Sequence, residues 1–321
     1  MLGDCHIHVI MDGENYRRAV DRHRDAVQEE VIRRCFSEYQ SRGITFLREG
    51  GDSYHVSERA RDLAPEYGIE YRTPLFAIHK KGHYGGIVGY GFETMEEYRN
   101  LICLAKEKKS DFIKIMVSGL IDFSQVGVLS EEGLDRETIR EMIWVAHEEG
   151  FAVMAHTNGA KNAMDAIEAG VDSLEHGAFM DEECVCALAE SDTVWVPTLS
   201  PCLNMVGCGR YDDGVLEEIG AIHKERIRQA IDRKAKLALA ATQAPGRCPM
   251  EKERRQSFPL CLIPIRKRTP CWLLFGRASR KSGGVFEENK RVTLQIYTPA
   301  PAQSGCGGGL WDFLRFFPAG G

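Results

Sequence analysis

The stretch FAVMAHTNGAKNAMDAIEAGVDSLEHG, residues 151–177, decides the fold class. It begins with an apolar run at 151–157, continues with helical periodicity at 160–169, and ends with a second short run at 173–177. Gly170 ends the helical segment, as glycine commonly does at helix C-termini. An apolar strand, a helix and another apolar strand in so few residues predict a strand–helix–strand unit of a parallel sheet.

The same alternation extends over residues 1–240. Apolar runs predict strands at 3–10, 44–50, 69–78, 112–119, 151–157, 173–177 and 193–200. Helical periodicity predicts helices at 29–42, 56–67, 95–109, 135–149, 160–169, 181–190 and 216–239. Seven strand-then-helix units predict an α/β fold, a (β/α)8 TIM-like barrel with seven units legible and the eighth missing or replaced. A doubly wound open sheet is the alternative.

Composition narrows the class of protein. The chain has 321 residues, 43% hydrophobic and 27% charged, which is ordinary for a globular protein. It contains no apolar run of about 18 residues, and its first residues, MLGDCHIHVI, lack the pattern of a signal peptide. Eleven cysteines without CxxC pairs favour reduced thiols. No phosphate-binding glycine motif follows a predicted strand. We expect a cytoplasmic protein with a small-molecule substrate and no nucleic-acid or membrane partner, and we leave homo-oligomerisation open.

Residues 241–321 differ from the rest of the chain. They carry 13 basic and 5 acidic residues, a net charge of +8, whereas residues 1–240 have a net charge of −14. They also hold 8 of the 12 prolines and show neither helical nor strand periodicity over most of their length. We therefore divide the chain into an incomplete barrel at 1–240 and a basic, Pro-rich, poorly ordered tail at 241–321. Translation in a shifted reading frame is the interpretation that we favour, and a genuine basic extension is the alternative.

Five polar side chains belong to the predicted strands or their C-terminal ends, where barrels carry their catalytic groups. His6 and His8 are two apart on the first strand, so both can face one ion. Lys114 lies within the apolar run FIKIMVS, and a buried ammonium must be neutralised, paired or chemically altered. His156 and His176 end the fifth and sixth strands. Each histidine alone is also compatible with a structural role, so the prediction rests on the joint pattern.

Four motifs carry a resemblance to a known family. DCHIH at 4–8, FIKIMVSG at 112–119, AHTNG at 155–159 and SLEHG at 173–177 together resemble the amidohydrolase superfamily. Within it they are most similar to the branch related to imidazolonepropionase and the prolidase-like dipeptidases. The resemblance implies a hydrolase that acts on carbon–nitrogen bonds of amides, cyclic amides or dipeptide-like substrates.

The resemblance also implies one or two divalent metal ions, with zinc as the expected metal. His6 and His8 would hold the first ion, and His156 and His176 the second. Lys114 would be carboxylated on its amine by carbon dioxide and would bridge the two ions. The carbamate would replace a buried cation by an anionic oxygen ligand.

Other residues are expected around this centre. The loop HKKGHYGG, residues 79–86, follows the third strand and is rich in glycine and hydrogen-bond donors, although an ordinary surface loop is the alternative. The candidates for contacting a carbonyl or carboxylate of the substrate are His79, His83 and Tyr84. Arg48, at the end of the second strand, is a weaker candidate for binding an anionic group of the substrate. Asp4 and Glu175 are both candidates for orienting the imidazoles, and the sequence does not choose between them.

The superfamily pattern fails at the eighth strand. That strand typically supplies an Asp in a short Gly-Ser-Asp-type motif, which serves as metal ligand and proton shuttle. After Asp232 the only aspartate here is Asp312, in GLWDFLRFF, and we assign it no role. The catalytic acid/base therefore stays unassigned, and the alternative function is a noncatalytic metal- or ligand-binding barrel remnant.

Overall fold

The computed structural model describes residues 2–13, 15–238 and 240, and every ladder between its named strands is parallel. The strands are β1 (Leu2–Ile7), β2 (Ile44–Glu49), β3 (Glu70–Arg72), β4 (Ala77–Lys80), β5 (Gly89–Phe92), β6 (Ile113–Met116), β7 (Val153–Thr157), β8 (Ser173–His176) and β9 (Val194–Val196). They form a three-stranded sheet, β1-β2-β3, and a six-stranded sheet, β5-β4-β6-β7-β8-β9. Apart from β5, which pairs on the outer side of β4, neighbouring strands follow one another along the chain within each sheet, as in a β/α barrel.

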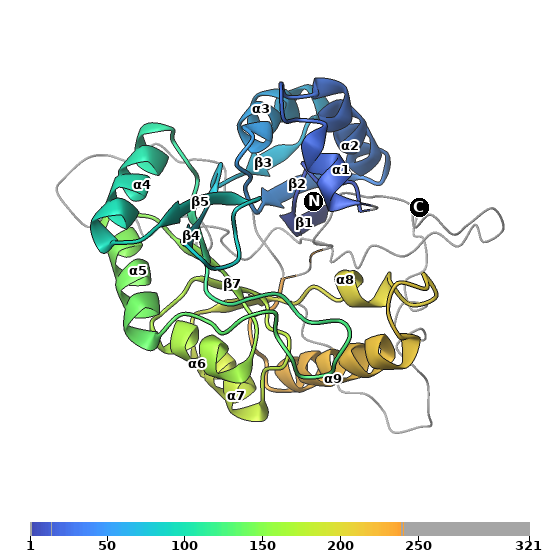
Figure 1. The fold of residues 1–321 in the computed structure, drawn as a ribbon, viewed down its shortest axis with the longest axis vertical. Coiled ribbons are helices and arrows are strands. Elements are labelled where there is room, and N and C mark those ends of the chain that lie inside the picture. The colour runs from blue at the N-terminus through green and yellow to red at the C-terminus, as the bar shows by residue number, and fades with distance from the viewer. Residues whose placement is uncertain (1, 14, 239, 241–321) are drawn as a thin grey trace.

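Helices cover the outside of the strands (Figure 1). They are α1 (Tyr16–Asp21), α2 (Glu29–Ser41), α3 (Val56–Leu63), the 3-10 helix η1 (Ala64–Tyr67), α4 (Met95–Glu107), α5 (Arg136–Glu148), α6 (Ala160–Glu168), α7 (Glu182–Glu190), α8 (Ser200–Leu203) and α9 (Asp213–Asp232). Side chains of Thr94, Asp135, Asp181 and Asp212 cap α4, α5, α7 and α9 by accepting a backbone N–H of the first turn. Among the described residues, no helix is long and apolar enough to cross a membrane.

The predicted third strand is divided into two. The run at 69–78 forms β3 in one sheet and β4 in the other, with a break at Pro74 and at Leu75, whose φ is 66°. A proline lacks the N–H that a ladder needs, and a leucine at positive φ cannot continue an extended strand. The short strand β5, which the sequence analysis did not predict, extends the second sheet beyond β4.

The predicted seventh helix ends earlier than expected. Residues 216–239 were expected to be helical, but α9 ends at Asp232, and Lys234 adopts a φ of 61°. The chain then runs beside β9: the Trp195 N–H donates to the Lys236 carbonyl at 2.8 Å, and the Ala238 N–H donates to the Trp195 carbonyl at 2.9 Å. This contact is an isolated parallel bridge between Trp195 and Leu237, outside the named strands. Leucine, lysine and alanine favour helices, so pairing with β9 overrides their propensity here.

The interior near this bridge joins the two sheets. Cys5 of β1, Phe46 of β2, Val194 and Val196 of β9, and Ala238 form one buried hydrophobic cluster. Side chains from the first and last strands therefore pack together, as in a barrel. The prediction that residues 241–321 do not complete the barrel lies outside the described residues.

Candidate metal centre

The structure brings the four predicted histidines together. His6 and His8 come from β1 and the residue after it, and His156 and His176 from β7 and β8. Ring centroids are 5.4 Å apart for His6 and His8, 4.7 Å for His6 and His176, and 4.6 Å for His156 and His176. Lys114 lies on β6 between β4 and β7 and is 1% exposed. One compact buried cluster therefore contains side chains from separate strands.

Local backbone features place these rings. Between Asp4 and Ile7 the register of β1 against β2 shifts, so that Cys5 and His6 both stand opposite Arg48. Such a bulge redirects side chains, and bulges are common beside active sites. His176 has a φ of 68°, and its carbonyl accepts a 2.9 Å hydrogen bond from Trp195 Nε1. A non-glycine residue in this region is strained, which is typical of functional sites.

A glycine makes room for the second histidine. A Cβ at Gly50 would lie 2.4 Å from Cε1 and 2.6 Å from Nε2 of His8. Only a residue without a side chain therefore permits this position of the His8 ring. Gly50 directly follows β2, so the end of that strand shapes the cluster as well.

In each of the four imidazoles, one ring nitrogen contacts an oxygen atom of the protein. The contacts are His6 Nδ1 to Glu175 Oε2 at 2.5 Å, His8 Nδ1 to the Gly51 carbonyl at 3.2 Å, His156 Nε2 to the Gly119 carbonyl at 3.2 Å, and His176 Nδ1 to Thr198 Oγ1 at 2.6 Å. A carbonyl only accepts, so the contact with Gly51 favours a proton on Nδ1 of His8. His156 Nε2 also lies 3.4 Å from Nδ2 of Asn158, a donor, so its contacts do not fix its tautomer. The second ring nitrogen of His8 then presents a lone pair, and buried His6 Nε2 has no hydrogen-bond partner among the described residues.

Burial sets the protonation of the cluster. Loss of solvation lowers the pKa of His8 to about 4 and of His156 to about 3, and it lowers the pKa of His6 and of His176 well below the usual value. Burial also lowers the pKa of Lys114 to about 7, and the Nζ atom has no hydrogen-bond partner in the described part of the chain. The imidazoles are therefore neutral near pH 7, and a substantial fraction of the lysine is a free amine.

This donor set fits a divalent metal ion. Histidine binds metal ions as the neutral imidazole. A bound ion can also supply the missing interaction of a buried polar atom that has no hydrogen bond. Within residues 2–238, leaving out 14, no three His, Cys, Asp or Glu side chains already converge at ligand distances. The fit therefore rests on chemistry, burial and proximity.

The predicted substrate-binding residues lie in different surroundings. The Tyr84 ring is 5.3 Å from the ring of His156, so this residue borders the cluster. The His83 side chain is 35% exposed, with Nδ1 3.7 Å from Glu131 Oε1. His79 Nδ1 donates to the Lys80 carbonyl at 3.0 Å. Of the three, Tyr84 alone makes a ring contact with a clustered histidine among the described residues.

Arg48 was considered as a group for an anionic substrate, and its surroundings argue against that role. The residue is 2% exposed, and its guanidinium donates to the Cys5 carbonyl at 2.8 Å and to Ser173 Oγ at 3.0 Å. It also forms an ion pair with Glu175. The guanidinium is therefore already bound to acceptors within the protein. The sequence did not reveal its pairing with Glu175.

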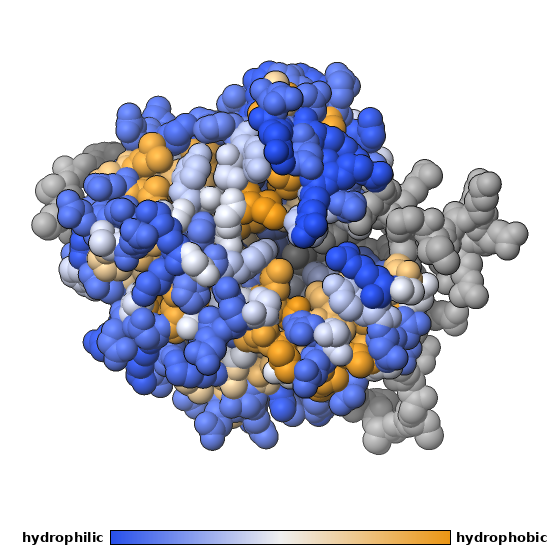
Figure 2. Space-filling view, in the orientation of Figure 1, coloured by the Kyte–Doolittle hydropathy of each residue, from blue (hydrophilic) through white to orange (hydrophobic). Residues whose placement is uncertain are grey.

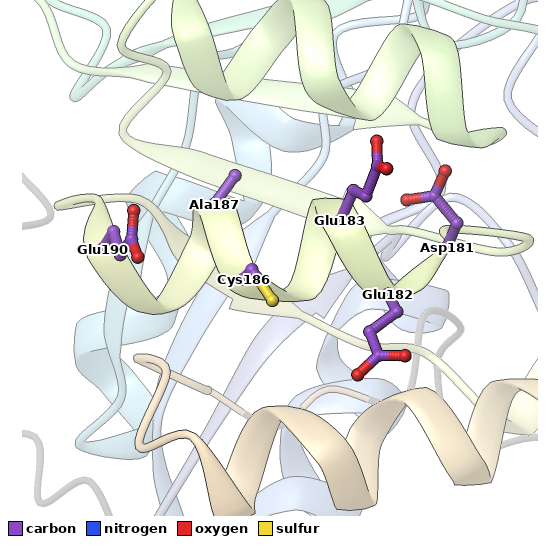
Figure 3. A pocket seen from close by; sticks show the side chains of 6 residues that line it. All are labelled: Asp181, Glu182, Glu183, Cys186, Ala187 and Glu190. Carbon is purple, nitrogen blue, oxygen red and sulfur yellow. The ribbon is translucent and has the colours of Figure 1, made fainter.

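An acidic pocket lies elsewhere, on the outer surface of α7. Its lining residues are Asp181, Glu182, Glu183, Cys186, Ala187 and Glu190 (Figure 3). Glu182 forms an ion pair with Arg233, which follows α9. The pocket shares no residue with the histidine cluster, and we do not include it in the candidate centre.

The face in Figure 2 is largely hydrophilic along the outer helices, with hydrophobic side chains toward its centre.

Parallel strands with covering helices, and a buried His–Lys cluster inside them, are the arrangement expected of a β/α barrel. The chain belongs to the amidohydrolase family, whose sequence profile matches residues 2–241. This confirms both the predicted superfamily and the barrel, and it sets aside the open-sheet alternative.

Individual relatives agree with this assignment. Ochratoxinase of Aspergillus niger is 24% identical over 286 residues, which cover 76% of this chain and 58% of that protein. A crystal structure of A. niger ochratoxinase has a TM-score of 0.61 at 21% identity and covers 77% of this chain and 63% of that one. A Xaa-Pro dipeptidase with bound methionine has a TM-score of 0.61 at 22% identity, covering 77% and 66%. This chain thus spans 58% of the length of ochratoxinase.

Proposed function

We propose that this protein is a metal-dependent hydrolase that acts on carbon–nitrogen bonds of amides, cyclic amides or dipeptide-like substrates. The observation that carries the proposal is one buried cluster of four neutral imidazoles and an unpartnered lysine amine in a member of the amidohydrolase family. Relatives named as an ochratoxinase and a Xaa-Pro dipeptidase support this class of bond.

The clustered side chains divide into two ligand groups in this proposal. His6 and His8 would hold one divalent ion and His156 and His176 a second, and zinc suits their nitrogen ligands. Lys114 would contribute as a carbamate: its neutral amine nitrogen would bond to the carbon of carbon dioxide, and a proton would leave to solvent. A lysine pKa of about 7 supports this step, because the amine then has its lone pair available near neutral pH.

Bound ions would lower the pKa of a water molecule and polarise the carbonyl that it attacks. The chain's own contribution on the substrate side is Tyr84, which borders His156. Burial raises the pKa of Tyr84 to about 12, so the phenol keeps its proton and can donate it to a carbonyl or carboxylate oxygen. The more exposed His83 is the next candidate for that contact.

A second candidate function is a metal- or ligand-binding barrel without catalysis. The observation that favours it is the sequence beyond residue 232, where no Gly-Ser-Asp motif occurs and Asp312 is the one aspartate. Without an acid/base group at the eighth strand, proton transfer to the leaving nitrogen loses a factor of about 10²–10⁴. Metal binding and hydrolysis therefore have to be measured separately.

We also propose that the substrate is a small molecule, that no nucleic acid is a partner, and that the protein works in the cytoplasm. Thiols that form no disulfide among the described residues support the last of these: Cys35, Cys103, Cys184, Cys186 and Cys202. Reducing compartments keep cysteines in this form. Whether the chain forms homo-oligomers stays an open prediction.

The test uses the full chain loaded with zinc. Hydrolysis of N-acyl amino acids, dipeptides and small cyclic amides is assayed alongside the metal content. We expect wild type to bind zinc and to hydrolyse at least one of these amides, and His156→Asn to lose both properties. His55→Asn is the matched control, because His55 is an exposed residue paired with Glu58. Zinc binding without turnover of any amide would favour the second candidate, and no zinc binding would contradict both metal-based proposals.

A further inference from the structure

A buried chain of side chains leads away from the histidine cluster. His6 Nδ1 lies 2.5 Å from Glu175 Oε2, and the other oxygen of Glu175 accepts from the Arg48 guanidinium and, at 2.8 Å, from Ser173 Oγ. Arg48 Nη1 donates to the same Ser173 Oγ at 3.0 Å, and its Nε donates to the Cys5 carbonyl. The network connects β1, β2 and β8, and so joins the two sheets through the interior.

Of the two carboxylates considered for orienting the imidazoles, the geometry selects Glu175. The Asp4 carboxylate accepts from the Tyr39 hydroxyl at 3.1 Å and from the His6 backbone N–H at 3.3 Å. Glu175, which is fully buried, contacts the His6 ring itself.

The contact also determines where the His6 proton lies. A carboxylate beside a ring nitrogen at 2.5 Å requires a proton between them, because two lone pairs at this distance would repel each other. A neutral imidazole has one N–H, so placing it on Nδ1 leaves the lone pair on Nε2. That atom is the buried nitrogen without a partner.

We propose that Glu175, held by Arg48 and Ser173, is a positioning residue that fixes His6 as the Nδ1–H tautomer and presents its Nε2 lone pair to the centre. Arg48 provides the opposite charge that a buried carboxylate needs. Both Glu175 oxygens are thereby engaged, and the Lys114 amine has no hydrogen bond within the described residues. That Nε2 binds a metal rests on the proposed function, whereas the tautomer is a property of the protein without metal.

The isosteric substitution Glu175→Gln is expected to move the His6 ring proton from Nδ1 to Nε2. In Glu175→Gln, the amide carbonyl must turn toward Arg48 and Ser173, which are donors, and the NH2 group then faces His6 Nδ1. That nitrogen becomes the acceptor, the proton moves to Nε2, and the lone pair leaves the centre. Adding Arg48→Met removes the donor that holds the amide, so the carbonyl can turn back and the Nδ1–H form returns.

The experiment reads both the tautomer and the metal. Long-range 1H–15N correlation spectra of full-length protein labelled in histidine report the His6 tautomer, with the signal assigned by its loss in His6→Asn. Competition with a chelator gives the zinc affinity. We expect the Nδ1–H form in wild type, the Nε2–H form in Glu175→Gln with zinc affinity lowered about 10–100-fold, and partial recovery of both in the double variant Arg48→Met/Glu175→Gln.

The matched control is Asp172→Asn, because the Asp172 carboxylate also contacts a histidine, His147 Nε2, at 2.7 Å outside the cluster. Its zinc affinity should equal that of wild type. An unchanged His6 tautomer and zinc affinity in Glu175→Gln would overturn the inference.

If Glu175→Gln does not fold, Ser173→Ala replaces it. We expect this variant to lose about threefold in zinc affinity, because it lacks one hydrogen bond to Glu175. An unchanged zinc affinity would contradict the inference. A protein that shows these effects without hydrolysing amides would retain the inference and refute the proposed hydrolase.

Discussion

At the scale of single residues, Lys114 is the most informative member of the centre. Its side chain is buried on an apolar strand, and its Nζ has no partner among the described residues. A metal-bridging carbamate would resolve the cost of burying this amine. We expect Lys114→Ala to lose most bound zinc and to regain part of it in the presence of acetate or propionate, as measured by zinc content after dialysis.

The control for this substitution is Lys161→Ala, which removes a surface lysine paired with Asp165. Its zinc content should match that of wild type. Full zinc occupancy in Lys114→Ala without added carboxylate would mean that this lysine has a structural role only.

Gly50 tests the position of His8. A methyl group at this position would overlap the His8 ring, with Cβ 2.4 Å from Cε1. We expect Gly50→Ala to displace the ring and lower zinc affinity at least about tenfold, the lower range for disturbed metal ligands. Gly86→Ala is the control, because a Cβ there meets nothing within 4 Å. Isothermal titration with zinc measures both variants, and equal affinities would contradict the proposed ligand role of His8.

The histidines could be predicted from sequence because each lies within one residue of the C-terminal end of an apolar strand, and parallel strands end at one edge. The pairing of Arg48 with Glu175 could not. It depends on the bulge in β1 and on a side chain that reaches from β2 to β8 through the interior. Sequence spacing carries no information on such a contact. For this reason the sequence analysis named Arg48 as a candidate for binding the substrate.

At the scale of elements, the sequence predicted the strand–helix units well where apolar runs and glycine stops agree. The helices at 95–109 and 135–149, for example, are α4 and α5, shorter by one or two residues at their ends. It failed where tertiary pairing decides. The segment after Asp232 contains strong helix formers, yet it turns and pairs with Trp195 of β9. Short elements such as α1 and β5 offer too few residues for a periodic pattern.

The packing of α9 against β9 makes stability depend on pH. His223 of α9 lies edge-on to Trp195, with ring centroids 5.6 Å apart, and neither of its ring nitrogens has a partner among the described residues. Burial lowers the pKa of His223 from 6.5 to about 4. As the pH falls, His223 is protonated in the unfolded chain before it is protonated in the folded protein. The contribution of His223 to the free energy of unfolding is therefore highest above pH 6.5 and decreases as the pH falls toward 4.

His223→Leu should remove this dependence, because leucine fills the site without titrating. Between about pH 7.5 and about pH 5, wild type should lose about 2 kcal/mol more free energy of unfolding than the variant does. Urea denaturation at both values measures the difference. Equal losses in the two proteins would show that His223 is solvated or already paired.

At the scale of the whole molecule, the eighth unit decides whether the barrel is catalytic. The last described contact with β9 is the isolated bridge between Leu237 and Trp195, and the change in charge and proline content follows directly in the sequence. Resequencing the coding DNA around codon 241 tests the reading frame. We expect a frame shift whose correction restores a Gly-Ser-Asp-like motif and raises hydrolysis by about 10²–10⁴-fold. A confirmed frame, together with amide hydrolysis by this chain, would refute that explanation.

The central claim is that the clustered imidazoles and Lys114 form a metal centre at the strand C-termini of an amidohydrolase barrel. The most direct measurement is anomalous diffraction at the zinc edge from crystals of the full chain grown with zinc and bicarbonate. The account predicts one or two peaks about 2 Å from ring nitrogens of His6, His8, His156 and His176, with extra density on the Lys114 amine. Zinc bound only elsewhere, with these five side chains unliganded, would contradict it.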